Sequence, residues 1–179
     1  MRILFVTLIV VILDQLTKQL VKAHFHLTES IMIIGDFFRF TYIENPGMAF
    51  GLRIAGPLFF TVFSAIACVV IFYFLYRLRA EPLLPRLALA LVLGGAIGNL
   101  IDRALYGKVI DFLDFGFGMT RWPIFNIADV AVSIGMVLLI AIVLFEKDEE
   151  RVDDSRLPEK VKSRDLPESE ERDIWDDLE

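Results

Sequence analysis

Four apolar runs, each close to twenty residues long, dominate the first 145 positions of the chain. They cover residues 3–23, 57–78, 86–104 and 125–145. An α-helix needs about 20 apolar residues to cross roughly 30 Å of hydrocarbon, so each run has the length of a membrane span. The pattern predicts an all-α membrane domain over residues 1–146. In it, four helices form one bundle, and the loops 24–56 and 105–124 lie on the same side.

A cleaved signal peptide is the alternative interpretation of the first run, because Arg2 precedes it and Val21-x-Ala23 ends it. Signal peptides rarely carry an aspartate and a lysine directly after the apolar stretch, and three further spans follow here. Asp14 and Lys18 are four residues apart, so a helix places them on one face, where they can neutralise each other. We therefore expect an uncleaved first span.

The first long loop contains a short pattern with a period of two. Aromatic residues alternate with other residues from Phe38 to Ile43, which is typical of a β-strand. Asn45-Pro46-Gly47 then has the chemistry of a turn, because proline fixes φ and glycine tolerates positive φ. A loop this rich in aromatic rings is expected at the level of the lipid headgroups, where it can also grip a lipid-linked ligand.

Charge is distributed unevenly along the chain. Residues 146–179 carry a net charge of −8, whereas residues 1–145 carry +2. Such dense charge cannot bury a core, so residues 147–179 are predicted to form a disordered cytoplasmic tail. Asp173-Ile174-Trp175 is the segment there that suggests a short docking element. The acidity gives no support to nucleic-acid binding, which needs a basic surface.

The arginines of the middle loop predict the orientation of the bundle. The basic residues at its two ends are equal in number, but Arg77, Arg79 and Arg86 cluster in the short loop between the second and third runs and at the run ends beside it. Because the positive-inside rule weighs short loops most, we expect both termini in the cytoplasm.

The unusual polar residues gather at one end of the predicted bundle. In four antiparallel spans, the second half of the first run, the end of the third and the start of the fourth share a side. These segments and their loops contribute Asp14, Lys18, Asn99, Asp102, Arg103, Asp111, Asp114, Asn126 and Asp129. Ionisable groups at membrane depth cost several kcal/mol unless they are paired, hydrated or used, so this end is the candidate functional face.

The third run combines polar and small residues. Asn99, Asp102 and Arg103 follow i, i+3, i+4 spacing on one helix face, and Arg103 can pair bidentately with Asp102 as a structural clamp. The glycines of Gly94–Gly98 lie near one face of the same helix, where small residues permit close packing.

Asp111 and Asp129 are the carboxylates best placed for acid–base chemistry. Asp111 lies between Ile110 and Phe112, an apolar setting that removes water and raises the pKa of its carboxyl group. Two carboxylates in such a site share a proton, which provides one base and one acid near neutral pH. The base takes a proton from water as the water attacks a peptide carbonyl, and the acid protonates the carbonyl oxygen. The pattern leaves open which of the two begins as the base.

Other chemistries have weaker support. His24 and His26 show no His-Glu-x-x-His spacing, no serine lies in a Gly-x-Ser-x-Gly turn, and the only cysteine, Cys68, lies in an apolar run. The glycines at 94–98 lack the lysine of a phosphate-binding loop. The residues alone therefore leave two classes open. One is an intramembrane aspartyl hydrolase, and the other is a proton- or cation-coupled transporter that uses the same carboxylates.

Five ordered motifs extend over roughly residues 8 to 135. They are Asp14-Gln15-x-x-Lys18, Asn45-x-Gly47-x-Ala49-Phe50, Gly95-x-x-Gly98-Asn99-x-x-Asp102-Arg103, Val109-x-Asp111-Phe112 and Phe125-Asn126-x-Ala128-Asp129. In type and spacing they resemble bacterial lipoprotein signal peptidase, also called signal peptidase II. The resemblance implies a four-helix inner-membrane aspartic endopeptidase whose active site lies at the outer face and needs no metal or other cofactor. It also implies a small extracytoplasmic β-cradle formed by the 31–56 loop.

Carried over position by position, the resemblance implies that Asp111 and Asp129 are the catalytic pair. The supporting or substrate-binding positions would be Asp14, Lys18, Asn45, Gly47, Asn99, Asp102, Arg103, Asn126 and Ala128. The implied substrate is a prolipoprotein with diacylglycerol on its lipobox cysteine, cleaved just before that cysteine. Membrane lipids are the other expected partner, and we expect the chain to act as a monomer.

Overall fold

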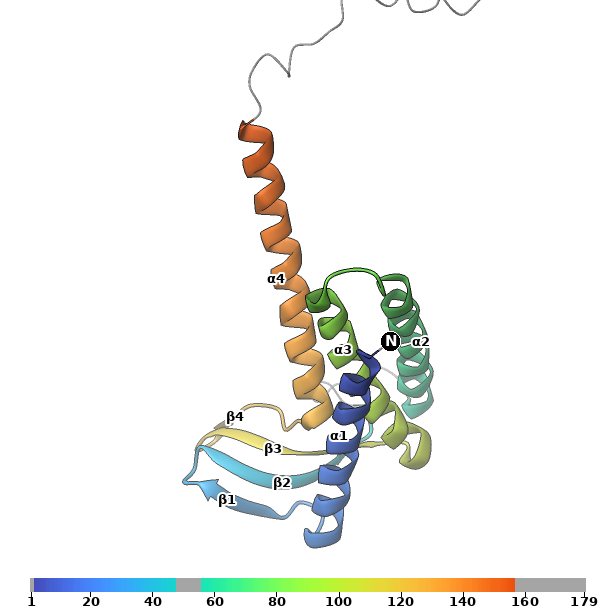
Figure 1. Cartoon of the computed structure of the whole chain (residues 1–179). Coiled ribbons are helices and arrows are strands. Elements are labelled where there is room, and N and C mark those ends of the chain that lie inside the picture. The colour runs from blue at the N-terminus through green and yellow to red at the C-terminus, as the bar shows by residue number, and fades with distance from the viewer. Residues whose placement is uncertain (1, 48–55, 157–179) are drawn as a thin grey trace, which may run out of the picture. The chain divides into compact units, whose positions relative to one another are not determined.

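The structure is a computed structural model that describes residues 2–47 and 56–156 (Figure 1). Its helices are α1 (Leu4–His24), α2 (Pro57–Arg77), α3 (Leu83–Tyr106) and α4 (Ile127–Arg156). Its strands are β1 (Ser30–Ile34), β2 (Phe38–Asn45), β3 (Val109–Phe117) and β4 (Thr120–Arg121). The chain forms two compact units, Met1–Ala141 and Ile142–Glu179, and the candidate site belongs to the first.

All four predicted spans are helices. Each is long and apolar enough to cross a membrane, and in α4 this part extends from Ile127 to Phe145. The four-span prediction is therefore confirmed, with helix ends that differ from the predicted ends by two or three residues at most over the apolar part.

Helix α4 continues beyond its apolar part. It ends at Arg156, so residues 147–156, which the charge pattern assigned to a disordered tail, are helical. Neither glycine nor proline occurs between Phe145 and Pro158, and glutamate, lysine and arginine are good helix formers. The rest of the expected tail, including the suggested docking element at 173–175, lies outside the described residues.

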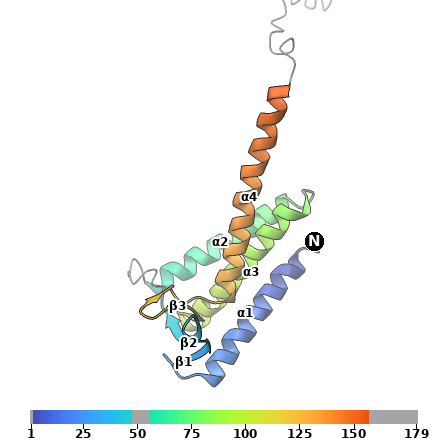
Figure 2. The same ribbon diagram turned by 90° about the vertical axis from the view of Figure 1, so that its left-hand side faces the viewer.

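Helix α3 lies between α1 and α2, as Figure 2 shows, and also packs against α4. Its glycines make this possible. A Cβ atom on Gly94 would lie 2.7 Å from Cβ of Val10 in α1, and one on Gly95 would lie 2.2 Å from the carbonyl oxygen of Ala128 in α4. The predicted use of these glycines in close helix packing is confirmed.

The strands form one antiparallel sheet in the order β1-β2-β3-β4. The predicted strand around Phe38–Ile43 is confirmed as β2. The sheet extends beyond the expected 31–56 loop, because β3 and β4 come from the second long loop. In β3 the aspartates interrupt the alternation of apolar and polar residues, so the period-two signal is absent from its sequence.

Two sets of contacts hold the sheet. Val21 at the end of α1 forms a buried cluster with Tyr42 of β2 and with Ile110 and Phe112 of β3, which fixes the sheet beside α1 (Figure 1). A polar ladder also crosses all four strands. It runs from Ser30 Oγ to Thr41 Oγ1 (2.8 Å), from Thr41 Oγ1 to Asp114 Oδ2 (2.7 Å) and from Arg121 Nε to Asp114 Oδ1 (2.6 Å). The start of β3, which carries Asp111, is thus fixed to α1 and to its neighbouring strand.

We expect Gly95→Ala to destabilise the bundle by about 1–3 kcal/mol, because the added methyl group forces α3 away from α4. Gly56→Ala is the matched control, since no atom lies within 4 Å of a Cβ atom built there and φ of Gly56 is −74°. Thermal unfolding in detergent micelles measures both. Equal stability of the two variants would contradict close packing at Gly95.

Candidate active site

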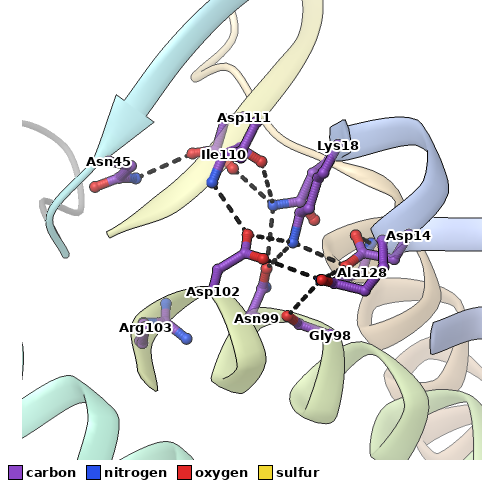
Figure 3. A network of polar contacts seen from close by, with 12 residues as sticks. Asp14, Lys18, Asn45, Gly98, Asn99, Asp102, Arg103, Ile110, Asp111 and Ala128 are labelled. Atoms are coloured by element: carbon purple, nitrogen blue, oxygen red, sulfur yellow. Dashed lines mark hydrogen bonds and ion pairs between the residues drawn. The ribbon is translucent and has the colours of Figure 1, made fainter. Parts of the chain in front are cut away.

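A buried lysine lies at the centre of the polar residues at this end of the bundle (Figure 3). The side chain of Lys18 is 0% exposed, and its Nζ lies 2.9 Å from Asp14 Oδ2 and 2.9 Å from Asp102 Oδ2. Lys18 Nζ also donates to Asn99 Oδ1 at 2.9 Å. The predicted pairing of Asp14 with Lys18 is confirmed, and it extends to a second carboxylate from α3.

The remaining oxygens of the two carboxylates bind other elements. Asp14 Oδ1 accepts the backbone N–H of Ala128 at 2.9 Å, which satisfies a free donor at the start of α4. Asp102 Oδ2 accepts the backbone N–H of Ile110 at 3.2 Å, at the start of β3. Every charge in this buried group is therefore paired and hydrogen-bonded, the condition under which burial of ions is tolerated.

Gln15 belongs to the first motif, and its side chain binds both buried carboxylates, a role that the sequence did not predict. Its Nε2 lies 2.9 Å from Asp102 Oδ1, 3.1 Å from the carbonyl oxygen of Gly98 and 3.2 Å from Asp14 Oδ2. Gln15 is the residue after Asp14 in α1. The Gln15 side chain therefore links both carboxylates of the Lys18 group, which a sequence shows only as an amide next to an aspartate.

Asn126 and Asp129 bind each other at the start of α4. Asn126 Oδ1 accepts the backbone N–H of Asp129 at 3.0 Å, and Asp129 Oδ2 accepts the backbone N–H of Asn126 at 3.2 Å. These reciprocal bonds have the pattern of a capping box, with the cap directly before Ile127. The i, i+3 spacing therefore begins the helix and at the same time fixes one oxygen of Asp129.

The side-chain amide of Asn126 joins the lysine group to Asp111. Its Nδ2 lies 2.7 Å from Asp111 Oδ1, 3.1 Å from Asn99 Oδ1 and 3.3 Å from the carbonyl oxygen of Ile110. Asn99 Nδ2 in turn donates to Asp129 Oδ1 at 2.8 Å. Two asparagines thus bring the carboxylates of Asp111 and Asp129 into one network.

Asp111 is the more enclosed of the two carboxylates. It is 3% exposed and accepts hydrogen bonds from Asn126 and, at 3.2 Å, from Asn45 Nδ2. Burial and then the nearby Asp129 carboxylate raise the pKa of Asp111 to about 7, although the hydrogen bonds from the two asparagines act in the opposite direction. The predicted desolvation of Asp111 is confirmed.

Arg103 does not pair with Asp102, so the predicted clamp is wrong. Adjacent residues on a helix point in directions about 100° apart, and here Asp102 faces Lys18 whereas Arg103 faces α2. Arg103 donates to Ser64 Oγ at 3.1 Å, and its Nε has no hydrogen-bond partner among the described residues. Its guanidinium interacts electrostatically with Asp129, Asp111 and Asp102.

The turn after β2 supplies the remaining predicted residues of the first loop. Asn45 Oδ1 accepts the backbone N–H of Gly47 at 3.0 Å, which orients the Asn45 amide toward Asp111. Gly47 has φ +99°, and a Cβ atom there would lie 2.4 Å from the Phe60 ring, so glycine is required. The other motif positions, Ala49 and Phe50, lie outside the described residues.

No group of three or more histidine, cysteine, aspartate or glutamate side chains within 2–47 and 56–156 is arranged to hold a metal ion. The chemistry available at the site is that of carboxylates, amides and two cations. The Cβ atom of Ala128 lies 3.3 Å from a Cβ atom built on Gly98, so the side chain of Ala128 is next to the network. Every predicted site residue apart from Arg103 therefore belongs to the hydrogen-bond network or lies beside it.

Comparison with known proteins gives a consistent result. The family model for signal peptidase (SPase) II matches residues 6–145. The lipoprotein signal peptidase of Syntrophus aciditrophicus (strain SB) is 47% identical over 148 residues, which cover 80% of this chain and 91% of the relative. That of Moorella thermoacetica is 44% identical over 140 residues, which cover 78% and 90%.

Two solved structures of bacterial membrane enzymes, determined by the in meso method, have a similar fold. One has a TM-score of 0.73 at 32% identity and covers 83% of this chain and 90% of its own. The other has a TM-score of 0.70 at 33% identity and covers 80% and 92%. The four apolar helices and these structural likenesses define a multi-span membrane protein with the fold of bacterial membrane enzymes. Within that class, the chain belongs to the signal peptidase II family, the lipoprotein signal peptidases.

We expect Lys18→Met to lower the free energy of unfolding by about 3–5 kcal/mol, because it leaves Asp14 and Asp102 buried without their cation. Lys22→Met is the matched control on the same helix, since Lys22 is exposed and lies over the Tyr106 ring. The double variant Lys18→Met/Asp102→Asn should lose less than the sum of its single variants, as measured by unfolding in detergent. A Lys18→Met variant as stable as Lys22→Met would refute the central role of this lysine.

Proposed function

We propose that the chain cleaves diacylglyceryl-modified prolipoproteins just before the lipidated cysteine, using Asp111 and Asp129 as an aspartyl dyad. The observation that carries the proposal is the shared Asn126–Asn99 network, which holds both carboxylates while no lysine or arginine of the described residues forms an ion pair with either. Carboxylates without a direct cationic partner can exchange a proton between them, as acid–base catalysis requires.

In the resting enzyme the shared proton lies mainly on Asp111, because burial and the neighbouring carboxylate raise the pKa of Asp111 to about 7. Asp129, which is partly exposed, begins as the base. It takes a proton from water as the water oxygen bonds to the scissile carbonyl carbon, while Asp111 protonates the carbonyl oxygen. Collapse of the tetrahedral intermediate breaks the C–N bond. One hydroxyl of the intermediate returns its proton to Asp111 as the carbonyl re-forms, and the proton held by Asp129 passes to the leaving amine of the cysteine.

Arg103 has the properties of a substrate-binding residue in this scheme. It lies between Ser64 and the carboxylates, and its buried Nε has no hydrogen-bond partner among the described residues, so it can donate to a substrate carbonyl that enters the site. This replaces its expected role as a brace. Asp14, Lys18, Asn99, Asp102 and Asn126 position the dyad.

The proposed location is the bacterial inner membrane, with both termini cytoplasmic and the dyad at the outer face. Arg77, Arg79 and Arg86, in and beside the loop between α2 and α3, support this orientation through the positive-inside rule. The dyad lies at the end of the bundle where α4 begins, together with the sheet built from the two long loops. We propose that the chain acts as a monomer, with membrane lipids around its apolar helix faces.

We expect Asp111→Asn and Asp129→Asn each to reduce cleavage by about 10⁴-fold or more, since the amide keeps the shape of the side chain but cannot transfer the proton. Signal-peptide release from a purified lipid-modified lipobox peptide measures this. Asp114→Asn is the control on the same strand, where the carboxylate binds Thr41 and Arg121 instead of the network, and it should retain turnover within about tenfold. Robust turnover by either dyad variant would refute the dyad, and no release by the wild-type chain would refute the proposed function.

We expect turnover to fall as pH rises through about 7, because deprotonation of Asp111 removes the acid and leaves two charged carboxylates. Asn45→Asp should move this alkaline limb to higher pH by about one unit, since it replaces a hydrogen-bond donor to Asp111 with a negative charge. The variant keeps an oxygen for the N–H of Gly47. Glu81→Gln, an exposed charge change in the loop between α2 and α3, should leave the limb unchanged. A downward shift in Asn45→Asp would contradict Asp111 as the acid.

A further inference from the structure

A groove of about 360 Å³ runs along the first turns of α4 and reaches the carboxylate of Asp129. Its walls are Trp122, Phe125, Asp129, Val130, Ser133 and Ile134. Asp129 is the single charged residue among them, and the polar network lies on the other side of its carboxylate, where Asn99 Nδ2 donates to Oδ1. The groove therefore connects an apolar surface to one member of the proposed dyad.

The other end of the groove opens on an exposed, apolar flank of α4. Ile134 is 50% exposed although it lies within the apolar span, and Val137, one turn from Ser133, is exposed as well. Trp122 is 69% exposed and precedes α4 by five residues, so its ring lies near the start of the span. A tryptophan in this position is typical of the membrane–water interface.

The aromatic wall of the groove is held by the sheet. The Phe125 ring stacks on Phe115 at 5.7 Å between ring centroids, and Phe115 stacks on Phe38 at 4.5 Å. The backbone N–H of Trp122 donates to the carbonyl oxygen of Phe115 at 2.8 Å. The groove is thus formed by α4 and the segment before it, and the sheet fixes the aromatic wall.

The proposed substrate requires such a surface. The cysteine sulfur that carries the diacylglyceryl group is only four bonds from the scissile carbonyl carbon, so the lipid begins within roughly 5 Å of the attacked atom. Its acyl chains must leave beside the dyad and reach the bilayer. A second apolar pocket, of about 240 Å³ between α1 and the sheet, is lined by Leu20, Phe25, Phe40 and Phe112 among others but by neither Asp111 nor Asp129.

We propose that the groove along Trp122, Ser133 and Ile134 is the subsite for the diacylglyceryl group, and that it holds the acyl chain closest to the scissile bond. This inference rests on the proposed function. Because bilayer lipid is as apolar as the groove, the transfer of a chain from one to the other yields little binding free energy. The groove instead orients the cysteine against Asp129, so its loss should lower kcat more than it raises KM.

The direct test is photolabelling. A lipobox peptide whose cysteine carries a diacylglyceryl group with a diazirine near the carboxyl end of one acyl chain is bound to the Asp111→Asn chain, irradiated and analysed by peptide mass spectrometry. We expect labels on Trp122, Ser133 or Ile134. Labels on Leu20, Phe25 or Phe40 would overturn the proposal. Labelling of the groove by a diazirine in the apolar segment of the signal peptide would also overturn it.

A pair of variants tests the role in turnover. Ser133→Phe fills the groove one turn after Asp129, and we expect it to lower kcat roughly 10- to 100-fold with little change in KM. Val137→Phe adds a ring one turn further along the same exposed flank and should change kcat by less than about twofold. Equal kcat values for the two variants, at matched melting temperatures, would overturn the proposal. Cleavage of the unlabelled peptide by the wild-type chain distinguishes failure of the groove proposal from failure of the proposed function. If the wild-type chain does not cleave the peptide, the proposed function is refuted. If it cleaves the peptide but the labels lie elsewhere, only the groove proposal is refuted.

Discussion

The structure depends on one buried cation. Lys18 has no exposed side-chain surface, and an isolated ammonium group in such a place would cost several kcal/mol or lose its proton. Asp14 and Asp102 prevent this, and the same two carboxylates accept the backbone N–H groups of Ala128 and Ile110, the second residues of α4 and β3. The pairing of one lysine therefore sets where two further elements begin. Asp111 and Asp129 each lie one residue beyond those two donors, so their positions follow from the ionic group.

The side-chain amides of Asn99 and Asn126 determine how the carboxylates of Asp111 and Asp129 are oriented. Asn99 Oδ1 accepts from Lys18 and from Asn126, so its NH₂ group has to face Asp129. Asn126 is fixed in the same way, because its oxygen accepts the N–H of Asp129 and its nitrogen donates to Asp111. A hydrogen-bond chain with every member satisfied resists reorientation in a low-dielectric interior. Amide donors also stabilise a carboxylate less than a direct ion pair would, which leaves the shared proton free to move.

Sequence reasoning succeeded where one physical rule decides the outcome. Length and apolarity predicted the four spans, i, i+4 spacing predicted the Asp14–Lys18 pair, and the antiparallel order of spans brought distant polar residues to one end. It failed where residues from several helices or strands could serve as the partner of the same side chain. Spacing placed Arg103 beside Asp102, but the partner of Asp102 comes from α1, and no local pattern shows which helix supplies it. Strand β3 was missed because its aspartates serve the network and the polar ladder, which removes the alternation expected of a strand.

Under the proposed mechanism, the first turns of α4 allow a reaction that consumes water to take place beside lipid. Asn126 and Ala128 face the buried network, whereas Val130, Ser133 and Ile134 face the apolar groove, and Asp129 contacts both. A helix turns about 100° per residue, so a single turn is enough to present a polar side and an apolar side. The polar groups of the buried network next to Asp129 need no water molecule, because other residues of the network are their hydrogen-bond partners. In the proposed mechanism, the reacting water is confined to the space between the two carboxylates, and the proposed path of the substrate's lipid runs along the other flank of the same helix.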